Sequence, residues 1–215
     1  MPENKLYIAI AGNIGVGKTT LTRMLGQRLG WKTFFERVID NPYLSDFYGD
    51  MNRWSFHLQI FFLSNRFIDQ KKITEWPDSC IQDRSIYEDV EIFAHTLHKN
   101  GNMADRDYQN YQDLFATMVS YLRKPDLIIY LQSTVENLLQ HIQKRGRDYE
   151  KTIDPNYLAE LNDAYEAWID RAKEKEFKVI TFDMNDRDFE NNSEDFELLY
   201  RSIKELESQT WLRGV

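Results

Sequence analysis

The segment from Gly12 to Thr19 reads GNIGVGKT and has the spacing G-x-x-x-x-G-K-[ST], which is typical of a loop that binds nucleotide phosphates. Glycines let backbone N–H groups surround an anion, and a helix that begins at the end of the loop adds partial positive charge. Lys18 is placed to reach the β- and γ-phosphates of a nucleoside triphosphate, and Thr19 offers a hydroxyl to Mg²⁺. The residues predicted to bind the nucleotide are Gly12, Asn13, Ile14, Gly15, Val16, Gly17, Lys18, Thr19 and Thr20.

Features of other classes of phosphate-loop protein are missing from the sequence. No N-K-x-D segment that could recognise guanine occurs in the second half of the chain, which disfavours a GTPase. No strongly apolar strand ends in Asp-Glu, the pattern usual in ATP-driven machines. The loop itself occurs in all these classes, so the other features of the sequence have to distinguish between them. The absence of both features favours a small-molecule kinase.

Carboxylates end the second and third predicted strands, and ligands of open parallel sheets gather at the carboxyl ends of strands. Glu36 is placed to accept the proton of an attacking hydroxyl near the phosphates. Its alternative role is an ion pair with Arg37 or contact with solvent. Asp83 is placed to hold Mg²⁺ or its water, and Arg84 suits phosphate oxygens, although these two residues could equally form a local ion pair at a helix start.

Arginines also follow a predicted helix at Arg145 and Arg147. A polar stretch separates them from the next helix, so residues 145–154 suit a mobile lid that closes over the transferred phosphate and excludes water. The alternative is that these cations complement the dipole at the carboxyl end of their helix.

The elements that would position these side chains alternate along the chain. Short apolar runs with strand character are separated by longer segments of helical period, which indicates βαβ units and therefore an α/β fold with a parallel sheet. The predicted strands are Leu6–Ala11, Lys32–Glu36, Cys80–Asp83, Leu127–Leu131 and Lys178–Phe182. The predicted helices are Thr20–Leu29, Met51–Lys72, Ser85–His98, Asp105–Leu122, Val135–Lys144, Pro155–Lys175 and Glu194–Glu207. Residues 183–195 are expected to form a surface loop.

Several helix starts carry sequence signals. Ser85 with Glu88 and Ser133 with Glu136 have capping-box spacing, and Asp154 before Pro155 supplies an N-cap and a preset first turn. No linker or repeat interrupts the pattern, so residues 1–215 are predicted to form one domain.

Composition excludes several classes of protein. The 215 residues are 42% hydrophobic and carry a net charge of -8, which offers no overall attraction to nucleic acid or to an anionic membrane. No apolar stretch approaches the length that spans a bilayer, and the start MPENKLYIAI lacks the features of a signal peptide. The only cysteine, Cys80, cannot form an intrachain disulfide, so we expect a cytoplasmic protein.

Taken together, these residues resemble those of the deoxynucleoside kinases, in their bacterial deoxyadenosine and deoxyguanosine kinase branch. The matching segments run nearly from end to end and are AGNIGVGKTT, DNPYLSDFY, RWSFHLQIFFLSNRF, DRS followed by SIYED, and KRGR. The resemblance implies a P-loop kinase fold with a central five-stranded parallel sheet, flanking helices and an arginine-bearing lid. It also implies transfer of the γ-phosphoryl group of ATP to the 5'-hydroxyl of a deoxynucleoside in nucleotide salvage, with Mg²⁺.

The resemblance assigns roles position by position. Glu36 matches the catalytic base, Asp83 the acid linked to Mg²⁺, and Arg84 the cation that orients base and phosphate. Arg145 and Arg147 match the lid residues that donate hydrogen bonds to the transferred phosphate, beside Lys18 of the P-loop. Charge neutralisation and positioning are what phosphoryl transfer requires of such residues.

The remaining matches concern the deoxynucleoside. Tyr48 and Glu150 match the pair that binds the sugar 3'-hydroxyl. The base is assigned to Gln59, Arg66, Asp89 and Phe93. Deoxyadenosine is expected first, with deoxyguanosine and deoxycytidine next and thymidine least suited.

Periodicity leaves the base site open. Ser55, Gln59, Arg66 and Gln70 fall within one narrow stripe of their predicted helix, which a solvent-facing surface would explain equally well. Asp89 and Phe93, four residues apart, share one face of theirs.

One position departs from the family, and other functions stay open. His141 stands where an extra lid arginine often lies, so one charge-assisted donor is weakened or lost near neutral pH. The resemblance also implies a homodimer with a helical interface. The alternatives are a nucleoside monophosphate kinase of the thymidylate kinase type and a non-catalytic nucleotide-binding module.

Overall fold

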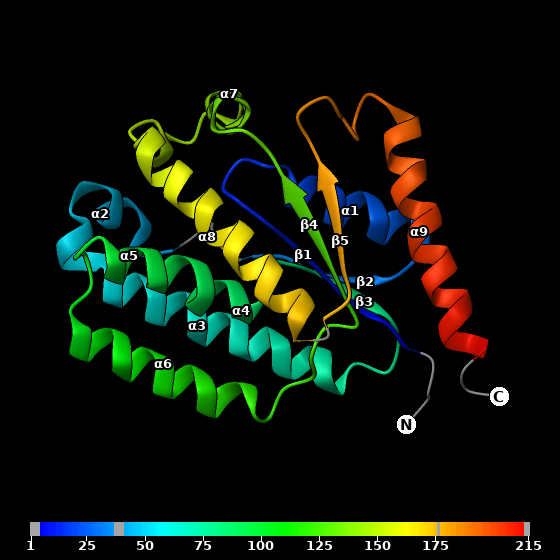
Figure 1. Ribbon diagram of the computed structural model, residues 1–215, viewed down its shortest axis with the longest axis horizontal. Helices are drawn as coiled ribbons and strands as arrows, with labels where there is room; N and C mark the ends of the chain where they lie inside the picture. The colour runs from blue at the N-terminus through cyan, green and yellow to red at the C-terminus, as the bar shows by residue number, and fades with distance from the viewer. Residues whose placement is uncertain (1–4, 37–40, 176, 213–215) are drawn as a thin grey trace.

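The computed structural model of the protein describes residues 5–36, 41–175 and 177–212, and Figure 1 shows their arrangement. Its sheet has five parallel strands in the order β2-β3-β1-β4-β5. The strands are β1 Tyr7–Gly12, β2 Lys32–Phe34, β3 Cys80–Asp83, β4 Leu127–Gln132 and β5 Val179–Asp183. The predicted α/β fold is confirmed, and β1, which leads into the phosphate-binding loop, lies at the centre of the sheet.

Helices cover both faces of the sheet (Figure 1). On one side lie α1 and α9; on the other lie α3 and α8, with α6 packed along α3. Helix α7 lies beyond the carboxyl ends of β4 and β5. The long helices are α1 Lys18–Leu29, α3 Met51–Glu75, α6 Asp105–Val119, α7 Val135–Arg145, α8 Pro155–Glu174 and α9 Ser193–Leu212. The short ones are α2 Leu44–Gly49, α4 Ile86–Glu88, η1 Asp89–Ala94, α5 His95–Lys99 and η2 Asp148–Glu150.

The central strands supply hydrophobic side chains to two cores, because successive residues of a strand point to opposite faces. Ile129 of β4 packs in the core that includes α1, α7 and α9, whereas its neighbour Tyr130 packs in the core that includes α3, α6 and α8. Both side chains are buried. Burial on both faces fixes the register of the sheet and therefore the place where each strand delivers its final residue.

Some elements differ from the prediction. Strand β2 ends at Phe34, two residues earlier than predicted, because its pairing with β3 stops at Phe34 opposite Gln82. Helix α2 was not predicted. The helix predicted over residues 85–98 has a π-helical middle, η1, which contains Asp89 and Phe93. Asp183 ends β5 and Ser193 begins α9, so the predicted surface loop is shorter at both ends.

Two of the helix starts are confirmed and one is corrected. The backbone N–H of Ser85 donates to Glu88 Oε1 over 2.8 Å, and Asp154 accepts from the N–H of Asn156 over 2.9 Å. For α7 the cap is Thr134 and not Ser133. The hydroxyl of Ser133 lies 3.3 Å from Asn185 Oδ1 instead, which joins this turn to the segment after β5.

The polar stripe of α3 faces the interior, so the solvent-facing interpretation is wrong. Ser55, Gln59, Arg66 and Gln70 are at most 5% exposed. Gln70 donates to the hydroxyl of Tyr7 on β1 and, over 2.9 Å, to Gln82 on β3. These polar contacts hold α3 against the strands that carry the site.

The single cysteine lies deep in the sheet. Cys80 is fully buried and has a free thiol, and burial raises its pKa to about 12.

None of the helices in the described ranges combines the length and apolar character that crossing a bilayer requires.

Candidate active site

The phosphate-binding loop joins the end of β1 to the start of α1. Gly12, Gly15 and Gly17 have φ angles of 147°, 87° and 99°, in the region that side chains disfavour. A Cβ on Gly12 would lie 2.7 Å from the carbonyl oxygen of Leu131, so only glycine fits there. Buried strands on both sides of β1 therefore hold the loop in one conformation.

Lys18 is the buried cation of this loop. Its Nζ donates to the carbonyl oxygen of Asn13 over 2.9 Å, and the residue is only 7% exposed. Burial, assisted by the charge of Arg84, lowers the pKa of Lys18 to about 7. An anion placed beside the ammonium group would reverse this shift, since an opposite charge favours the protonated form.

The side chain of Asn13 anchors the loop. Its Nδ2 donates to the carbonyl oxygen of Leu158 over 2.9 Å and to Asn162 Oδ1 over 2.8 Å, both on α8. Asn13 was predicted to bind nucleotide, and in the structure its side chain fixes the loop against α8.

Thr19 and Asp83 meet at the carboxyl end of strand β3. The hydroxyl of Thr19 donates to Asp83 Oδ2 over 2.6 Å, because β3 pairs with β1 and brings Asp83 opposite Ile10. Asp83 Oδ1 is buried and has no hydrogen-bond partner among the described residues. Burial is also the main cause that raises the pKa of Asp83. A hydroxyl beside a carboxylate with an unused oxygen is a donor set suited to Mg²⁺.

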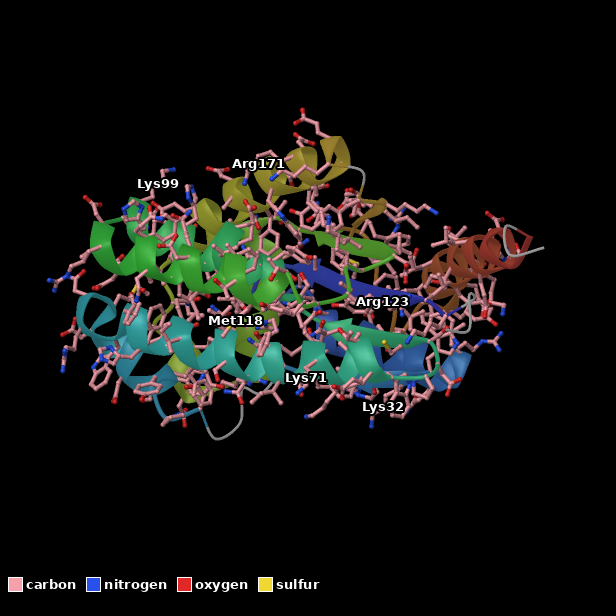
Figure 2. The ribbon with its side chains drawn as sticks, turned by 90° about the horizontal axis from the view of Figure 1, so that it is seen from below. Lys32, Lys71, Lys99, Met118, Arg123 and Arg171 are labelled. Atoms are coloured by element: carbon pink, nitrogen blue, oxygen red, sulfur yellow. The ribbon has the colours of Figure 1, made fainter. Side chains whose placement is uncertain are left out.

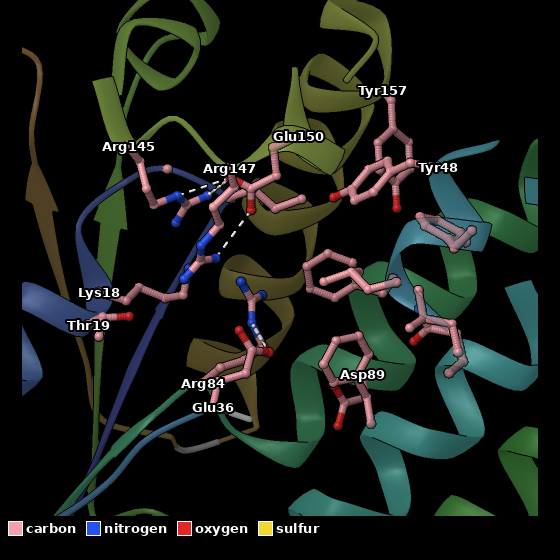
Figure 3. Close-up of a pocket in the computed structure, with 18 of the residues that line it drawn as sticks. Lys18, Thr19, Glu36, Tyr48, Arg84, Asp89, Arg145, Arg147, Glu150 and Tyr157 are labelled. Atoms are coloured by element: carbon pink, nitrogen blue, oxygen red, sulfur yellow. Dashed lines mark hydrogen bonds and ion pairs between the residues drawn. The ribbon is translucent and has the colours of Figure 1, made fainter. Parts of the chain in front are cut away.

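Glu36 lies between two buried arginines. Its Oε1 accepts from Arg66 Nη2 over 2.7 Å. It also lies 3.1 Å from Arg84 Nε, as Figure 3 shows. Burial alone favours the neutral acid, but the charges of Arg84, Arg66 and Lys18 outweigh it and lower the pKa of Glu36 to about 2. The carboxylate is therefore ionised and faces the cavity; its alternative partner Arg37 lies outside the described residues.

Arg66 connects this cluster to Asp89. Its Nε donates to Asp89 Oδ2 over 2.7 Å and its Nη1 to the carbonyl oxygen of Arg84 over 2.9 Å. Burial raises the pKa of Asp89 to about 6, against the lowering effect of Arg66. Asp89 lines the cavity beside Gln59, whereas Arg66 stands behind Asp89 and Glu36 and reaches the cavity through them.

The predicted lid holds its arginines on an acid. Arg145 donates to Glu150 Oε2 from Nε over 3.0 Å and from Nη2 over 2.5 Å, and Arg147 Nη1 donates to Glu150 Oε1 over 3.3 Å. Glu150 lies on η2 and is 5% exposed, and Figure 3 shows the three side chains together at one end of the cavity. The structure thus brings the lid residues and the predicted sugar residue into one group.

A cavity of about 270 Å³ lies beside Glu36. Glu36, Arg84 and the lid group occupy one end, and Gln59, Asp89 and Phe93 line it as well. Gln59 Oε1 is buried with no hydrogen-bond partner among the described residues. The residues that enclose the cavity are Ile14, Gly15, Lys18, Thr19, Phe35, Glu36, Leu44, Phe47, Tyr48, Leu58, Gln59, Phe62, Arg84, Asp89, Phe93, Arg145, Arg147, Glu150 and Tyr157.

A larger cavity of about 520 Å³ lies on the other side of the phosphate-binding loop. Arg23, Lys144 and Arg187 add positive charge to its wall. The two cavities share part of their lining, namely Gly15, Lys18, Thr19, Arg145 and Arg147. A group passed from one cavity to the other would therefore cross between these cations.

His141 faces the second cavity and not the lid acid. Its Nδ1 lies 3.0 Å from the carbonyl oxygen of Gly15, so the imidazole joins α7 to the phosphate-binding loop. An Nδ1–H is needed for this hydrogen bond, whatever the charge of the ring.

Sequence reasoning missed part of the site. Tyr157 lines the first cavity, and Leu44 and Phe47 do so because α2 places them there. Glu88 is a fully buried carboxylate beside Arg84, 3.4 Å from its Nη1. The capping-box spacing identified Glu88 as a helix residue, but only the fold shows that it faces a cation.

A phosphate-binding loop between two adjoining cavities, with an ionised carboxylate and a cluster of cations where they meet, defines a P-loop phosphotransferase. Residues 8–207 match the family described as deoxynucleoside kinase. The chain therefore belongs to the deoxynucleoside kinase family, and it is an ATP-dependent deoxynucleoside kinase.

Similar proteins share this assignment. A deoxyadenosine/deoxycytidine kinase of Bacillus subtilis is 48% identical over 171 residues, which is 79% of this chain and 78% of that protein. A deoxyguanosine kinase of the same organism is 36% identical over 203 residues, or 93% of this chain and 97% of that protein. The structure of a deoxyadenosine kinase from M. mycoides with bound dATP is 29% identical, covers 93% of this chain and 99% of that one, and has a TM-score of 0.81.

Proposed function

We propose that this enzyme transfers the γ-phosphoryl group of ATP to the 5'-hydroxyl of a deoxynucleoside, with purines favoured: deoxyadenosine first, then deoxyguanosine or deoxycytidine. The observation that carries the proposal is that two polar side chains, Gln59 and Asp89, line the same cavity as Glu36. The relatives that act on deoxyadenosine, deoxycytidine and deoxyguanosine support the same range of substrates.

Two groups are suited to the edge of the base. The unpaired Oε1 of Gln59 can accept from an exocyclic amino group, and the side-chain NH₂ can donate to a ring nitrogen. Adenine presents such a donor and acceptor side by side. Asp89 offers a further acceptor, held by Arg66, and Phe93 supplies an aromatic face. Thymine can pair with the Gln59 amide through its ring N3–H, but it carries a carbonyl oxygen where adenine carries its amino group and so offers no donor there to Asp89.

The sugar and the reacting groups are assigned to the end of the cavity near the lid. Tyr48 and Glu150 bind the 3'-hydroxyl, and burial raises the pKa of Tyr48 well above its usual value, so that its hydroxyl keeps a proton to donate. Glu36 accepts the hydrogen bond and then the proton of the 5'-hydroxyl. Arg84 holds Glu36 and neutralises charge beside it.

Lys18, Arg145 and Arg147 line both cavities and are assigned to the phosphates of ATP. Charge spread over the transferred phosphoryl group is stabilised by such cations without covalent help. Thr19 and Asp83 would hold Mg²⁺, whose chemistry when bound is to neutralise phosphate charge. The unpartnered Oδ1 of Asp83 fits that role.

Binding of ATP is expected to take up a proton above pH 7. The pKa of Lys18 is about 7 in the free protein because of burial, and phosphates beside the ammonium group raise it. At pH 8 close to one proton, roughly 0.9, enters per ATP bound if Lys18 becomes fully charged. ATP affinity therefore rises as pH falls from 9 towards 7. Titration calorimetry in buffers of different ionisation enthalpy measures the uptake.

The control for this uptake is Lys18→Met, which has no group to protonate. The uptake is the slope of the observed binding enthalpy against the ionisation enthalpy of the buffer. A slope of zero in the wild-type protein, or the same slope in Lys18→Met, would contradict the assignment.

The substrate proposal is tested by initial rates at fixed ATP with each of the four deoxynucleosides and their ribonucleoside counterparts. Deoxyadenosine is expected to give the highest kcat/KM and thymidine the lowest, since a site whose buried acceptor pairs with an amino group discriminates against a base that lacks one. Deoxynucleoside monophosphates serve as the control for the rival kinase class. Higher activity on a monophosphate, or thymidine ranking first, would overturn the proposal.

A homodimer in the cytoplasm is part of the same proposal. Figure 2 views the molecule from the side on which α3 and α6 lie, with Met118 at the end of α6. Ile68 on α3, Leu114 on α6 and Tyr121 just after it are exposed by 44%, 36% and 76%. Exposed apolar side chains on or just after two neighbouring helices suit a helical interface. The single unpaired cysteine suits a reducing compartment.

A further inference from the structure

We propose that Glu88 and the hydroxyl of Tyr165 form a buried clamp that fixes the guanidinium of Arg84 beside Glu36 and ties it to the phosphate-binding loop. Both are positioning residues for phosphoryl transfer, acting through Arg84. The inference rests on the proposed roles of Arg84 and Glu36.

A chain of hydrogen bonds connects Arg84 to Tyr165 and Tyr165 to Glu88. Arg84 Nη1 donates to the hydroxyl oxygen of Tyr165 over 2.5 Å, and that hydroxyl donates to Glu88 Oε2 over 2.7 Å. Arg84 Nη1 also lies 3.4 Å from Glu88 Oε2. The opposite side of the guanidinium, Nε, lies 3.1 Å from Glu36. The clamp therefore holds one end of the group whose other end meets the catalytic carboxylate.

The backbone of Arg84 needs support from its surroundings. Its φ angle is 67°, in the left-handed region that a residue with a side chain rarely adopts. Glu88 Oε1 accepts from the N–H of Ser85, the next residue, over 2.8 Å. One carboxylate thus fixes the turn after Arg84 with one oxygen and the Arg84 side chain with the other.

The same carboxylate reaches the phosphate-binding loop. The N–H of Gly12 donates to Glu88 Oε2 over 3.3 Å, and Gly12 is where β1 passes into the loop. Glu88 and Tyr165 are fully buried and Arg84 is 3% exposed. Removing charged groups from water is expensive, and a buried ion pair by itself adds little stability. A role in holding the phosphate-binding loop and Arg84 in fixed relative positions explains why Glu88 and Tyr165 are buried beside Arg84.

Tyr165 is suited to the middle of this chain of hydrogen bonds. Burial raises the pKa of Tyr165 well above its usual value, so the hydroxyl stays protonated and can accept from Arg84 while donating to Glu88. Its ring stacks on Tyr130 at 5.6 Å, which fixes its direction.

The first test is Tyr165→Phe, which keeps the packed ring and removes only the hydroxyl. We expect kcat to fall by about 10- to 100-fold, the scale of a misplaced catalytic group, with KM for ATP changed less than about twofold. The matched control is Tyr130→Phe, which removes a hydroxyl from the neighbouring, stacked ring. In the wild-type protein this hydroxyl donates to Glu166 over 2.9 Å. We expect kcat within about twofold of wild type for this control, because the Tyr130 hydroxyl donates to Glu166, an exposed residue, and not to the clamp.

The second test separates action through Arg84 from a general packing effect. In an Arg84→Lys background, Tyr165→Phe is expected to lower kcat by no more than about twofold further, because coupled residues show non-additive effects. Reductions that multiply, or a Tyr165→Phe enzyme with wild-type kcat, would overturn the clamp. Normal kcat in Arg84→Lys alone would also overturn it, together with the assigned role of Arg84. Glu88→Gln, which keeps an acceptor for Ser85, is expected to match Tyr165→Phe.

Discussion

Replacing Glu36 by glutamine is expected to lower kcat by about 10² or more, the usual loss when a general base is removed. Glutamine keeps the shape of the side chain but cannot take the proton of the 5'-hydroxyl. The Kd for ATP should stay near the wild-type value, because Glu36 lines the first cavity and not the second. Single-turnover rates and a separate ATP-binding titration distinguish the two effects.

The matched control for this variant is Glu91→Gln. Glu91 is a carboxylate on η1 that pairs with Arg171 at the surface over 2.8 Å, so its neutralisation should leave kcat unchanged. Equal activity of Glu36→Gln and the wild-type enzyme would remove Glu36 from the mechanism and leave the identity of the base open.

Replacing Lys18 by methionine is expected to lower kcat by about 10² to 10³, as does the loss of one group that stabilises charge in a transition state. Lys18 lines both cavities, and a water molecule that replaced its ammonium group would be neutral and could not supply its charge. The Kd for ATP should rise as well. Steady-state kinetics and ATP titration measure both quantities.

Lys144→Met is the comparison for this second variant. Lys144 also lines the second cavity, but its side chain is exposed, and its loss should change kcat by less than about tenfold because solvent screens the charge. Equal losses in the two variants would show that total charge, and not the buried position of Lys18, matters.

The parts of the fold that could be predicted are those with a strong local signal. The predictions of strand β4 and of the start of α8 were confirmed, because the apolar run LIIYL and an Asp-Pro cap mark them clearly. Helix α2, Leu44–Gly49, is too short to show a helical period. The π-helical turn η1 was also missed, since a period of 3.6 residues is what sequence patterns detect.

The candidate site shows the same division. The phosphate-binding loop is a contiguous motif, so its residues could be named from the sequence. Glu88 and Tyr165 come from segments far apart in the chain, and neither has a motif that announces contact with Arg84. The stripe on α3 could not be assigned to the interior from periodicity alone, because a polar face is ordinarily a solvated one.

The buried thiol of Cys80 makes the natural chain a convenient background for chemical labelling. At a pKa of about 12 almost none of this cysteine is thiolate near neutral pH, and its fully buried position excludes bulky maleimides. A cysteine introduced at an exposed position such as Asp148 would then be the reactive one. Fluorescent or spin probes at this position would test whether the proposed lid moves, without first replacing a core residue.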